Sequence, residues 1–430
     1  MKRGSRQWLV RSVLAAALAV FQLACGTERL EGPNQEQGPG QVSQAVSTCE
    51  KRTMSGGFRT ILHFNNPLAP CVVGSDSTRD LTIRNELVRL IDNVPAGSVI
   101  RGTWYSLSDT ETAIPAALVR AQSRGAVVQV SVDGGAGVPA AGSAARSYFD
   151  QLTHKRICPS TTGCLSSNSG AAHTKAWTFS RTTYPGETTT TTYVVWVGSY
   201  NMTNGADGNA GFNNSATLYN NQSLYNFVRD YLENMYAMSP RYSDYYDTSL
   251  TPARGFYMDE SASVYVSPEL NSDLVVQRID ADVWTPATGC VVRVINPHFT
   301  YERRAVTQQL ITMKNGGCNV AVIVNHIDQT EYDRLKAAGI PMKALKVSGG
   351  DRVHDKLMAI YAKKEGSTTW AYRVYTGSHN FSPGSLTGGD DIFVRLGEET
   401  GTSHPMYDAV LAHFNDGWNS PYAVTITGAN

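Results

Sequence analysis

In the first half of the chain, segments with the apolar pattern of a β-strand are followed by segments with the apolar pattern of an α-helix. Residues 99–105 and 127–132 are short runs rich in branched and aromatic side chains, which predicts two strands. Between them, residues 113–124 carry apolar side chains three and four positions apart, and Gly125 follows, so a helix is predicted that ends there. A further helix is predicted over residues 222–236.

The same order of elements is repeated in the second half. Residues 291–295 and 320–324 are predicted strands, and residues 301–314 form the predicted helix between them. Helices are also predicted over residues 329–338 and 405–414. Because strands alternate with helices in both halves, we expect an α/β fold of two similar halves, with mixed, mostly parallel sheets flanked by helices.

Each half also contains the phrase His-x-Lys, followed by a strand-like run that ends in Gly-Ser-x-Asn. The side chains in these phrases are His173, Lys175, Ser199 and Asn201 in the first half and His354, Lys356, Ser378 and Asn380 in the second. A repeat of this length predicts a domain duplication, which we place at residues 49–245 and 246–430. Two imidazoles, two ammonium groups and two amides together suit a site that binds a phosphodiester and attacks it.

The N-terminus carries the pattern of an export signal. Residues 1–24 combine a basic start with an apolar stretch too short to span a bilayer, which predicts a signal peptide. Cys25 stands where a bacterial lipoprotein is lipidated, and both lipidation and ordinary cleavage are compatible with the sequence. Residues 25–48 are polar and predict a flexible tether. No later segment has the length and apolar character of a transmembrane helix.

The net charge and the number of cysteines favour an exported protein whose partner is not a nucleic acid. The formal net charge is zero, and loss of residues 1–24 would remove four positive charges and no negative ones, which leaves a net charge of −4. A nucleic-acid partner is therefore not favoured. An even number of cysteines after Cys25 predicts three disulfides in an exported protein. They are Cys49, Cys71, Cys158, Cys164, Cys290 and Cys318. The pairing stays open, but the predicted elements favour Cys158 with Cys164 and Cys290 with Cys318.

With both phrases in matching contexts, residues 95–415 resemble the phospholipase D superfamily. Residues 117–133 are also similar to a segment of that family in which a helix, an Arg-Gly pair, a strand and an aspartate follow one another. The resemblance implies two α/β halves that face each other across a pseudo-two-fold axis, each supplying one phrase to a shared site. It further implies phosphodiester cleavage through a phosphohistidine intermediate, without a metal or other cofactor.

The resemblance also implies a role for each site residue. One histidine attacks phosphorus while the other, protonated, releases the alcohol, and His173 is implied as the nucleophile and His354 as the acid. The remaining implied roles are binding of the phosphate oxygens by Lys175, Lys356, Asn201 and Asn380, and substrate binding by Ser199 and Ser378.

The chain departs from the family pattern at two kinds of position. The family often has an aspartate shortly after each lysine, where this chain has Ser180 and Tyr361. The family also has an acid eleven residues after each asparagine, which orients an imidazole. Asp391 takes this place in the second half, whereas the first half offers only Asn214 or Ser215. We therefore expect the two histidines to differ in basicity.

We interpret the chain as an exported, monomeric phospholipase D-type enzyme. It would hydrolyse glycerophospholipids such as phosphatidylcholine, at a membrane surface, to phosphatidic acid and a head-group alcohol. Two alternatives stay open: a nuclease or other phosphodiesterase of the same superfamily, and a non-catalytic surface-binding protein on the same fold. The loop around Cys158 and Cys164 is a candidate lid. Four aromatic residues suit either a wall for a choline head group or the core: Trp104, Tyr105, Trp177 and Tyr200.

Overall fold

The structure is a computed structural model that describes residues 50–55, 58–68, 79–283, 287–347, 350–363 and 366–429. The predicted signal peptide, the predicted tether and the cysteines Cys25, Cys49 and Cys71 lie outside the described residues. These features therefore stay predictions.

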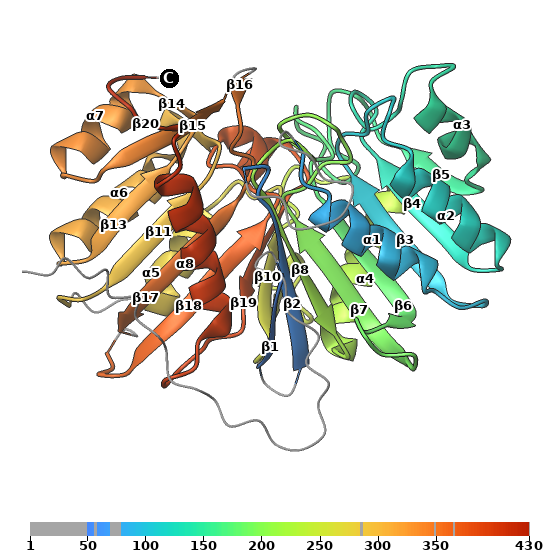
Figure 1. Cartoon of the computed structure of the whole chain (residues 1–430), viewed down its shortest axis with the longest axis horizontal. Coiled ribbons are helices and arrows are strands. Elements are labelled where there is room, and N and C mark those ends of the chain that lie inside the picture. The colour runs from blue at the N-terminus through green and yellow to red at the C-terminus, as the bar shows by residue number, and fades with distance from the viewer. Residues whose placement is uncertain are drawn as a thin grey trace, which may run out of the picture. The chain divides into compact units, whose positions relative to one another are not determined.

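The first part of the chain forms an eight-stranded sheet (Figure 1). Its strands, in sheet order, are β1 (Glu50–Ser55), β2 (Phe58–Asn65), β8 (Asn213–Tyr219), β7 (Thr190–Gly198), β6 (Ala176–Thr183), β3 (Val99–Trp104), β4 (Val127–Val132) and β5 (His154–Ile157). Only the β3–β4 and β4–β5 pairs are parallel. The other neighbours are antiparallel.

Helices cover both faces of this sheet, and successive residues of its central strands are therefore buried on opposite sides. Val194 of β7 packs in one apolar cluster with α1 and α2, whereas Val195 packs in another with α4. Three helices follow the strands in order before the first phrase, and the fourth follows β8: α1 (Thr82–Asp92), α2 (Ala113–Ser123), α3 (Ala144–Gln151) and α4 (Gln222–Ala237). β8 is accordingly buried at every position, and β7 is buried at consecutive positions in its second half.

The second part forms another mixed sheet, with ten strands (Figure 1). In sheet order they are β16 (Gly350–Asp351), β15 (Met342–Val347), β13 (Asn319–Ile323), β11 (Val291–Ile295), β17 (Leu357–Lys363), β18 (Trp370–Gly377), β19 (Ile392–Leu396), β10 (Ala262–Val266) and β9 (Phe256–Met258). β20 (Ala423–Thr425) pairs with β15, and β12 (His298–Phe299) pairs with β14 (His326–Ile327) in a separate two-stranded sheet.

Four α-helices belong to this second part: α5 (Leu274–Val283), α6 (Arg304–Asn315), α7 (Gln329–Ala337) and α8 (Pro405–Trp418). A 3₁₀ turn over Tyr301–Arg303 precedes α6, so the predicted helix at 301–314 begins with a tighter turn. α8 contacts β2 of the first sheet as well as β17 and β18 of the second. Its residues Val410 and Phe414 lie in the apolar cluster that contains side chains of both sheets, so this helix helps hold the sheets together.

The predicted α/β fold with sheets flanked by helices is confirmed, but the prediction of mostly parallel sheets is wrong. Parallel pairs occur only at β3–β4, β4–β5, β11–β13 and β13–β15 within the two large sheets described. The physical reason lies in the two phrases, since each encloses a pair of strands joined by a short connection. Strands joined in this way must run antiparallel. The pseudo-two-fold relation and the domain boundary near residue 245 stay predictions.

Two of the predicted disulfides are present. Cys290 and Cys318 stand immediately before β11 and β13, where Val291 lies opposite Asn319 in the parallel pair, and the Cα atoms of the cysteines are 4.3 Å apart. Cys158 and Cys164 close a short loop after β5, with Cα atoms 4.9 Å apart. Both agree with the pairing that the predicted elements favoured.

Candidate active site

A cavity of about 390 Å³ lies where the two phrases meet. Its lining residues come from β12 and from loops beside strands of both large sheets: Tyr105, Gly170, Ala171, His173, Asn201, Asp207, His298, His354, Asn380, Ser382, Gly384, Ser385 and Asp391. Both predicted histidines and both predicted asparagines are among them. The chain segments around residues 173 and 354, far apart in sequence, therefore share one site.

Hairpins bring the two ends of each phrase together. β6 begins directly after Lys175 and β7 ends at Gly198, and the Gly198 N–H donates to the Lys175 carbonyl at 3.2 Å. β17 and β18 form the equivalent hairpin in the second phrase. Because each hairpin folds the chain back on itself, His-x-Lys and Gly-Ser-x-Asn lie side by side at the same end of the two strands.

The glycine in each phrase allows a close approach of the next strand. A Cβ atom at Gly198 would lie 2.4 Å from the Asn214 carbonyl oxygen, and one at Gly377 would lie 2.1 Å from that of Ile392. Gly377 also has φ +135°, which side-chain-bearing residues rarely adopt. Glycine is thus required where β7 meets β8 and where β18 meets β19.

His173 is oriented by a carboxylate that follows the second phrase. Its Nδ1 lies 2.9 and 3.1 Å from the two carboxylate oxygens of Asp391, and its backbone N–H donates to the Asp390 carbonyl at 2.9 Å. The Tyr105 ring packs edge-on against the imidazole, with centroids 5.0 Å apart. With Nδ1–H donating to Asp391, a neutral His173 presents the lone pair of Nε2 away from that carboxylate.

His354 is oriented by an amide that follows the first phrase. Its Nδ1 lies 3.0 Å from Oδ1 of Asn213, and its backbone N–H donates to the Phe212 carbonyl at 3.0 Å. The amide oxygen can only accept, so Nδ1 of His354 carries the proton. Each histidine is therefore held by a residue that comes after the phrase of the other histidine.

The two serines hold these orienting groups. The Ser199 hydroxyl donates to Asn213 Oδ1 at 2.9 Å, and the Ser378 hydroxyl donates to Asp391 Oδ1. Both serines are fully buried. The structure thus gives them a positioning role, while their predicted direct contact with substrate stays a prediction.

Asn213 was missed by the sequence reasoning, which offered Asn214 or Ser215 as the orienting residue of the first half. Asn214 instead donates to Asp355 at 2.8 Å, and Asp355 also accepts from Nε2 of His413 at 2.8 Å. The signal for Asn213 was present, since it lies one position from the expected spacing. A strict count of residues could not anticipate a one-residue shift in the loop before β8.

Burial and mutual repulsion lower the pKa values of the cationic groups. Burial lowers the pKa of Lys175 to about 7, and burial together with the charge of Lys175 holds the pKa of Lys356 well below its usual range. The pKa of His173 is lowered by burial, although the charge of Asp391 opposes this, and that of His354 is lowered strongly by burial and Lys356. The histidines therefore differ in basicity, as the sequence predicted, and a bound anion would stabilise the charged forms of the two lysines.

The ammonium groups and amides complete the site. Nζ of Lys175 and Nζ of Lys356 donate to the carbonyl oxygens of His173 and His354, at 2.6 and 2.7 Å. The Asn201 side chain donates to Asp207 at 3.0 Å. Asp207 was not predicted as a site residue; its only sequence signal is a place in the polar, glycine-rich stretch after Asn201.

The positions where the family often has aspartate lie outside the cavity. Ser180 is on β6, and its hydroxyl accepts from the Val99 N–H at 2.8 Å. Tyr361 is on β17, and its ring stacks on Trp370 with centroids 4.6 Å apart. Neither residue lines the cavity. Their departure from the family pattern thus affects sheet packing and leaves the cavity lining intact.

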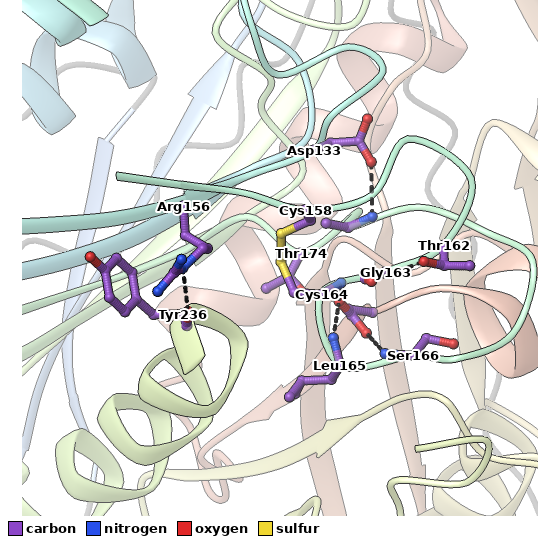
Figure 2. The surroundings of a disulfide bond; sticks show 12 residues. Asp133, Arg156, Cys158, Thr162, Gly163, Cys164, Leu165, Ser166, Thr174 and Tyr236 are labelled. Carbon is purple, nitrogen blue, oxygen red and sulfur yellow. Dashed lines mark hydrogen bonds between the residues drawn. A yellow bond between two sulfur atoms is a disulfide. The ribbon is translucent and has the colours of Figure 1, made fainter. Parts of the chain in front are cut away.

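The loop closed by the Cys158–Cys164 disulfide (Figure 2) is attached to the wall of the cavity. Asp390, which is fully buried, accepts from the backbone N–H groups of Cys164, Leu165 and Ser166. The chain then runs to Gly170 and Ala171, which line the cavity. The loop is thus tied to the residue next to Asp391, and a lid function stays a prediction.

Only one of the four candidate aromatic residues faces the cavity. Tyr105 lines it, whereas Trp104, Trp177 and Tyr200 are buried in the core of the first part. An aromatic wall of four rings is therefore not formed. Among the described residues, no three His, Cys, Asp or Glu side chains are grouped so that they could hold a metal ion. In this same part of the chain, no helix has the length and apolar character needed to span a bilayer.

Residues 289–418 match the family described as cardiolipin synthase, PLD-like domain. This segment contains the second His-x-Lys phrase, so the resemblance to the phospholipase D superfamily is confirmed, and residues 289–418 form a phospholipase D-like domain. No curated protein matches the sequence.

Several solved structures are similar to this chain at low identity. Phosphatidylserine synthase from Haemophilus influenzae is 11% identical, with a TM-score of 0.50 over 80% of this chain and 86% of its own. Polyphosphate kinase from Porphyromonas gingivalis is 13% identical, with a TM-score of 0.47, and this chain covers 46% of that longer one. The phospholipase D family member Nuc from Salmonella typhimurium is 18% identical, with a TM-score of 0.28 over 43% of this chain and 97% of its own.

Proposed function

We propose that the protein is a phospholipase D-type phosphodiesterase that hydrolyses glycerophospholipids to phosphatidic acid and a head-group alcohol. The observation that carries this proposal is the pair of imidazoles in one cavity, one held by the carboxylate of Asp391 and the other by the amide of Asn213. Two buried lysines beside them supply positive charge for an anionic phosphate. A phosphodiester needs a nucleophile on one side and a proton donor on the other.

The first step is displacement of the alcohol by His173. The Nε2 lone pair of His173 forms a bond to phosphorus, and the bond from phosphorus to the alcohol oxygen breaks. The imidazole becomes positively charged as it is phosphorylated, and the carboxylate of Asp391 on Nδ1 stabilises that charge. His354 gives the proton on its Nε2 to the departing oxygen, which leaves as the free alcohol.

The second step returns the enzyme to its starting state. Neutral His354 accepts a proton from water through Nε2, the water oxygen bonds to phosphorus, and the P–N bond to His173 breaks. The neutral amide of Asn213 stabilises a charged His354 less than a carboxylate would, so His354 releases its proton more readily. The partners of the two histidines therefore favour His173 as nucleophile and His354 as acid.

The phosphate would be held between the lysines and the amides of the two phrases. Lys175 and Lys356 neutralise the non-bridging oxygens, while Asn201 and Asn380 line the cavity and donate hydrogen bonds to them. Burial lowers the pKa values of the two lysines, and binding of this anion raises them. Substrate binding itself thus charges the site for catalysis.

A direct assay tests the proposal. The mature protein is incubated with phosphatidylcholine, with single-stranded and duplex DNA, and with bis(p-nitrophenyl) phosphate, beside His173→Ala and His354→Ala. Choline release that either substitution abolishes supports the proposal. DNA cleavage without choline release would move the assignment to a nuclease. Absence of turnover of every phosphodiester would leave a binding protein on this fold.

We also propose that the protein acts outside the cytoplasm. The disulfides Cys158–Cys164 and Cys290–Cys318 support this, because such bonds persist in oxidising compartments. Cell fractionation with a Cys25→Ser variant checks it. Release of that variant from membranes indicates a lipid anchor at Cys25, while recovery of the protein with reduced cysteines in the cytoplasm contradicts export.

A further inference from the structure

A third histidine lines the cavity and has no part in the reaction described above. His298 belongs to β12 and faces the same space as His173 and His354. The bridge between Phe299 and Phe381 places it beside Asn380. Its position in the chain gave no signal of a site, because it lies outside both phrases.

The ring of His298 is held in a fixed orientation. It stacks on the ring of His326, with centroids 5.0 Å apart and an angle of 18° between the planes. Nε2 of His326 in turn lies 3.4 Å from a carboxylate oxygen of Asp351. The backbone N–H of His298 donates to Asn296 Oδ1 at 3.2 Å. The side chain is therefore packed against His326 on one face while it lines the cavity.

His298 differs from the other two histidines in its nitrogen partners. Within the described part of the chain, neither of its ring nitrogens makes a hydrogen bond comparable to those of His173 with Asp391 or His354 with Asn213. Burial, followed by the charge of Lys356, lowers the pKa of His298 to about 4. The ring is therefore neutral at pH 7 and offers one donor and one acceptor. Such a pair matches a hydroxyl group, which also donates and accepts.

The side of the cavity around His298 is lined by polar side chains. Ser382 and Ser385 line it together with Asn380. The aromatic and acidic residues of the cavity, Tyr105, Asp207 and Asp391, contact His173 or Asn201 instead. A quaternary ammonium is normally bound by aromatic faces. The surroundings of His298 suit a hydroxylated group better.

In-line displacement by His173 puts the leaving alcohol on the opposite side of the phosphate, next to His354. A positive charge on His298 would lower the pKa of His354, which places the two rings near each other. The head group therefore passes His298 as it leaves. We propose that His298 determines specificity for the leaving alcohol, and that the site prefers a head group with a free hydroxyl, such as glycerol, over choline. This inference rests on the proposed function.

Substrates of matched charge and size show the effect of the head-group hydroxyl alone. Phosphatidylglycerol and phosphatidylpropanol, both singly anionic, are compared in the same detergent micelles, with phosphatidylcholine as a third substrate. The wild-type protein is expected to show a kcat/KM about tenfold higher for phosphatidylglycerol than for phosphatidylpropanol, because a lost hydrogen bond leaves a buried polar group unpaired. His298→Phe is expected to bring this ratio close to one, while His298→Gln, which keeps a donor and an acceptor, retains most of it.

Two controls keep the outcomes distinct. His326→Phe preserves a ring behind His298 and is expected to keep the preference, which shows that the His298 edge rather than the stack reads the hydroxyl. Turnover of bis(p-nitrophenyl) phosphate reports whether each variant retains a working phosphodiesterase site. Equal rates for the two lipids in the wild-type protein, or an unchanged ratio in His298→Phe, overturn this inference alone. Failure of every substrate in the wild-type protein overturns the proposed function as well.

Discussion

Nδ1 of His173 lies 2.9 Å from Oδ1 of Asp391, although 218 positions separate the two residues in the chain. The corresponding contact of His354 is made by an amide, that of Asn213, at 3.0 Å. One imidazole is therefore paired with a charge and the other with a neutral dipole. In the proposed mechanism this difference gives the two histidines separate roles, which pH–rate profiles can measure.

Replacing Asp391 with asparagine changes the basicity of His173. The carboxylate raises the pKa of His173 against the effects of burial and Lys175, so its removal lowers that pKa. Because the nucleophile must be neutral, activity is lost as the pH falls through this pKa. The acidic limb of the pH–rate profile is thus expected to move to lower pH. The maximal kcat is expected to fall about 10²-fold, because a neutral amide no longer stabilises the positive charge that the imidazole acquires when it is phosphorylated. An unmoved acidic limb would contradict the pairing.

The reverse change at Asn213 acts on the other limb. In Asn213→Asp, a carboxylate beside Nδ1 raises the pKa of His354. The acid must be protonated, and activity is lost as the pH rises through its pKa, so the alkaline limb is expected to move to higher pH. Asn315→Asp, at an exposed position at the end of α6, is the matched control and is expected to leave the profile unchanged. Movement of the acidic limb instead would exchange the roles of the two histidines.

Loss of one disulfide is expected to affect mainly stability, and loss of the other mainly activity. By loop-closure entropy, the short Cys158–Cys164 loop contributes about 2 kcal/mol to the free energy of unfolding and the longer Cys290–Cys318 loop about 3.5 kcal/mol. Serine pairs at 290 and 318 should therefore lower stability more. Serine pairs at 158 and 164 should lower kcat/KM more, because that loop leads into Gly170 and Ala171. Urea unfolding and phosphodiester turnover measure the two effects, and equal losses of activity would contradict the assignment.

Asp390 is expected to be important for stability without acting on substrate. Its carboxylate accepts three backbone N–H groups of the disulfide loop from a fully buried position. An asparagine side chain would accept through one oxygen only, so Asp390→Asn leaves buried donors unpaired and is expected to cost about 2–4 kcal/mol in the free energy of unfolding. Asp150→Asn on the exposed face of α3 serves as the control. A change below about 1 kcal/mol, within the worth of one ordinary hydrogen bond, would show that the anchor is dispensable.

Much of the fold could be predicted because its signals are local. The apolar runs at 99–105 and 291–295 and the helix pattern at 113–124 correspond to β3, β11 and α2 within one or two residues. The cysteines before β11 and β13 could be paired because parallel strands begin side by side. Strand direction was misjudged where the connections, rather than the strands, decide it, as in the β6–β7 hairpin.

The site was harder to predict where it depends on contacts between distant segments. His173, His354, Asn201 and Asn380 could be named because their spacing repeats. That Asp391 would serve the histidine of the other phrase could not be read from spacing, since it depends on how the sheets meet. His298 and Asp207 carry no repeated pattern, and only the position of their loops around the cavity brings them to the site.

Each histidine is oriented by a residue from the other part of the chain, so the site is complete only when both sheets have folded and joined. A chain in which only the first sheet has formed holds His173 without Asp391, and one with only the second sheet holds His354 without Asn213. Neither intermediate has an anchored nucleophile facing an anchored acid. Under the proposed function, a newly made chain therefore stays inert toward phosphodiesters until both sheets have joined. Activity during refolding should then appear when the sheets dock rather than when either one forms.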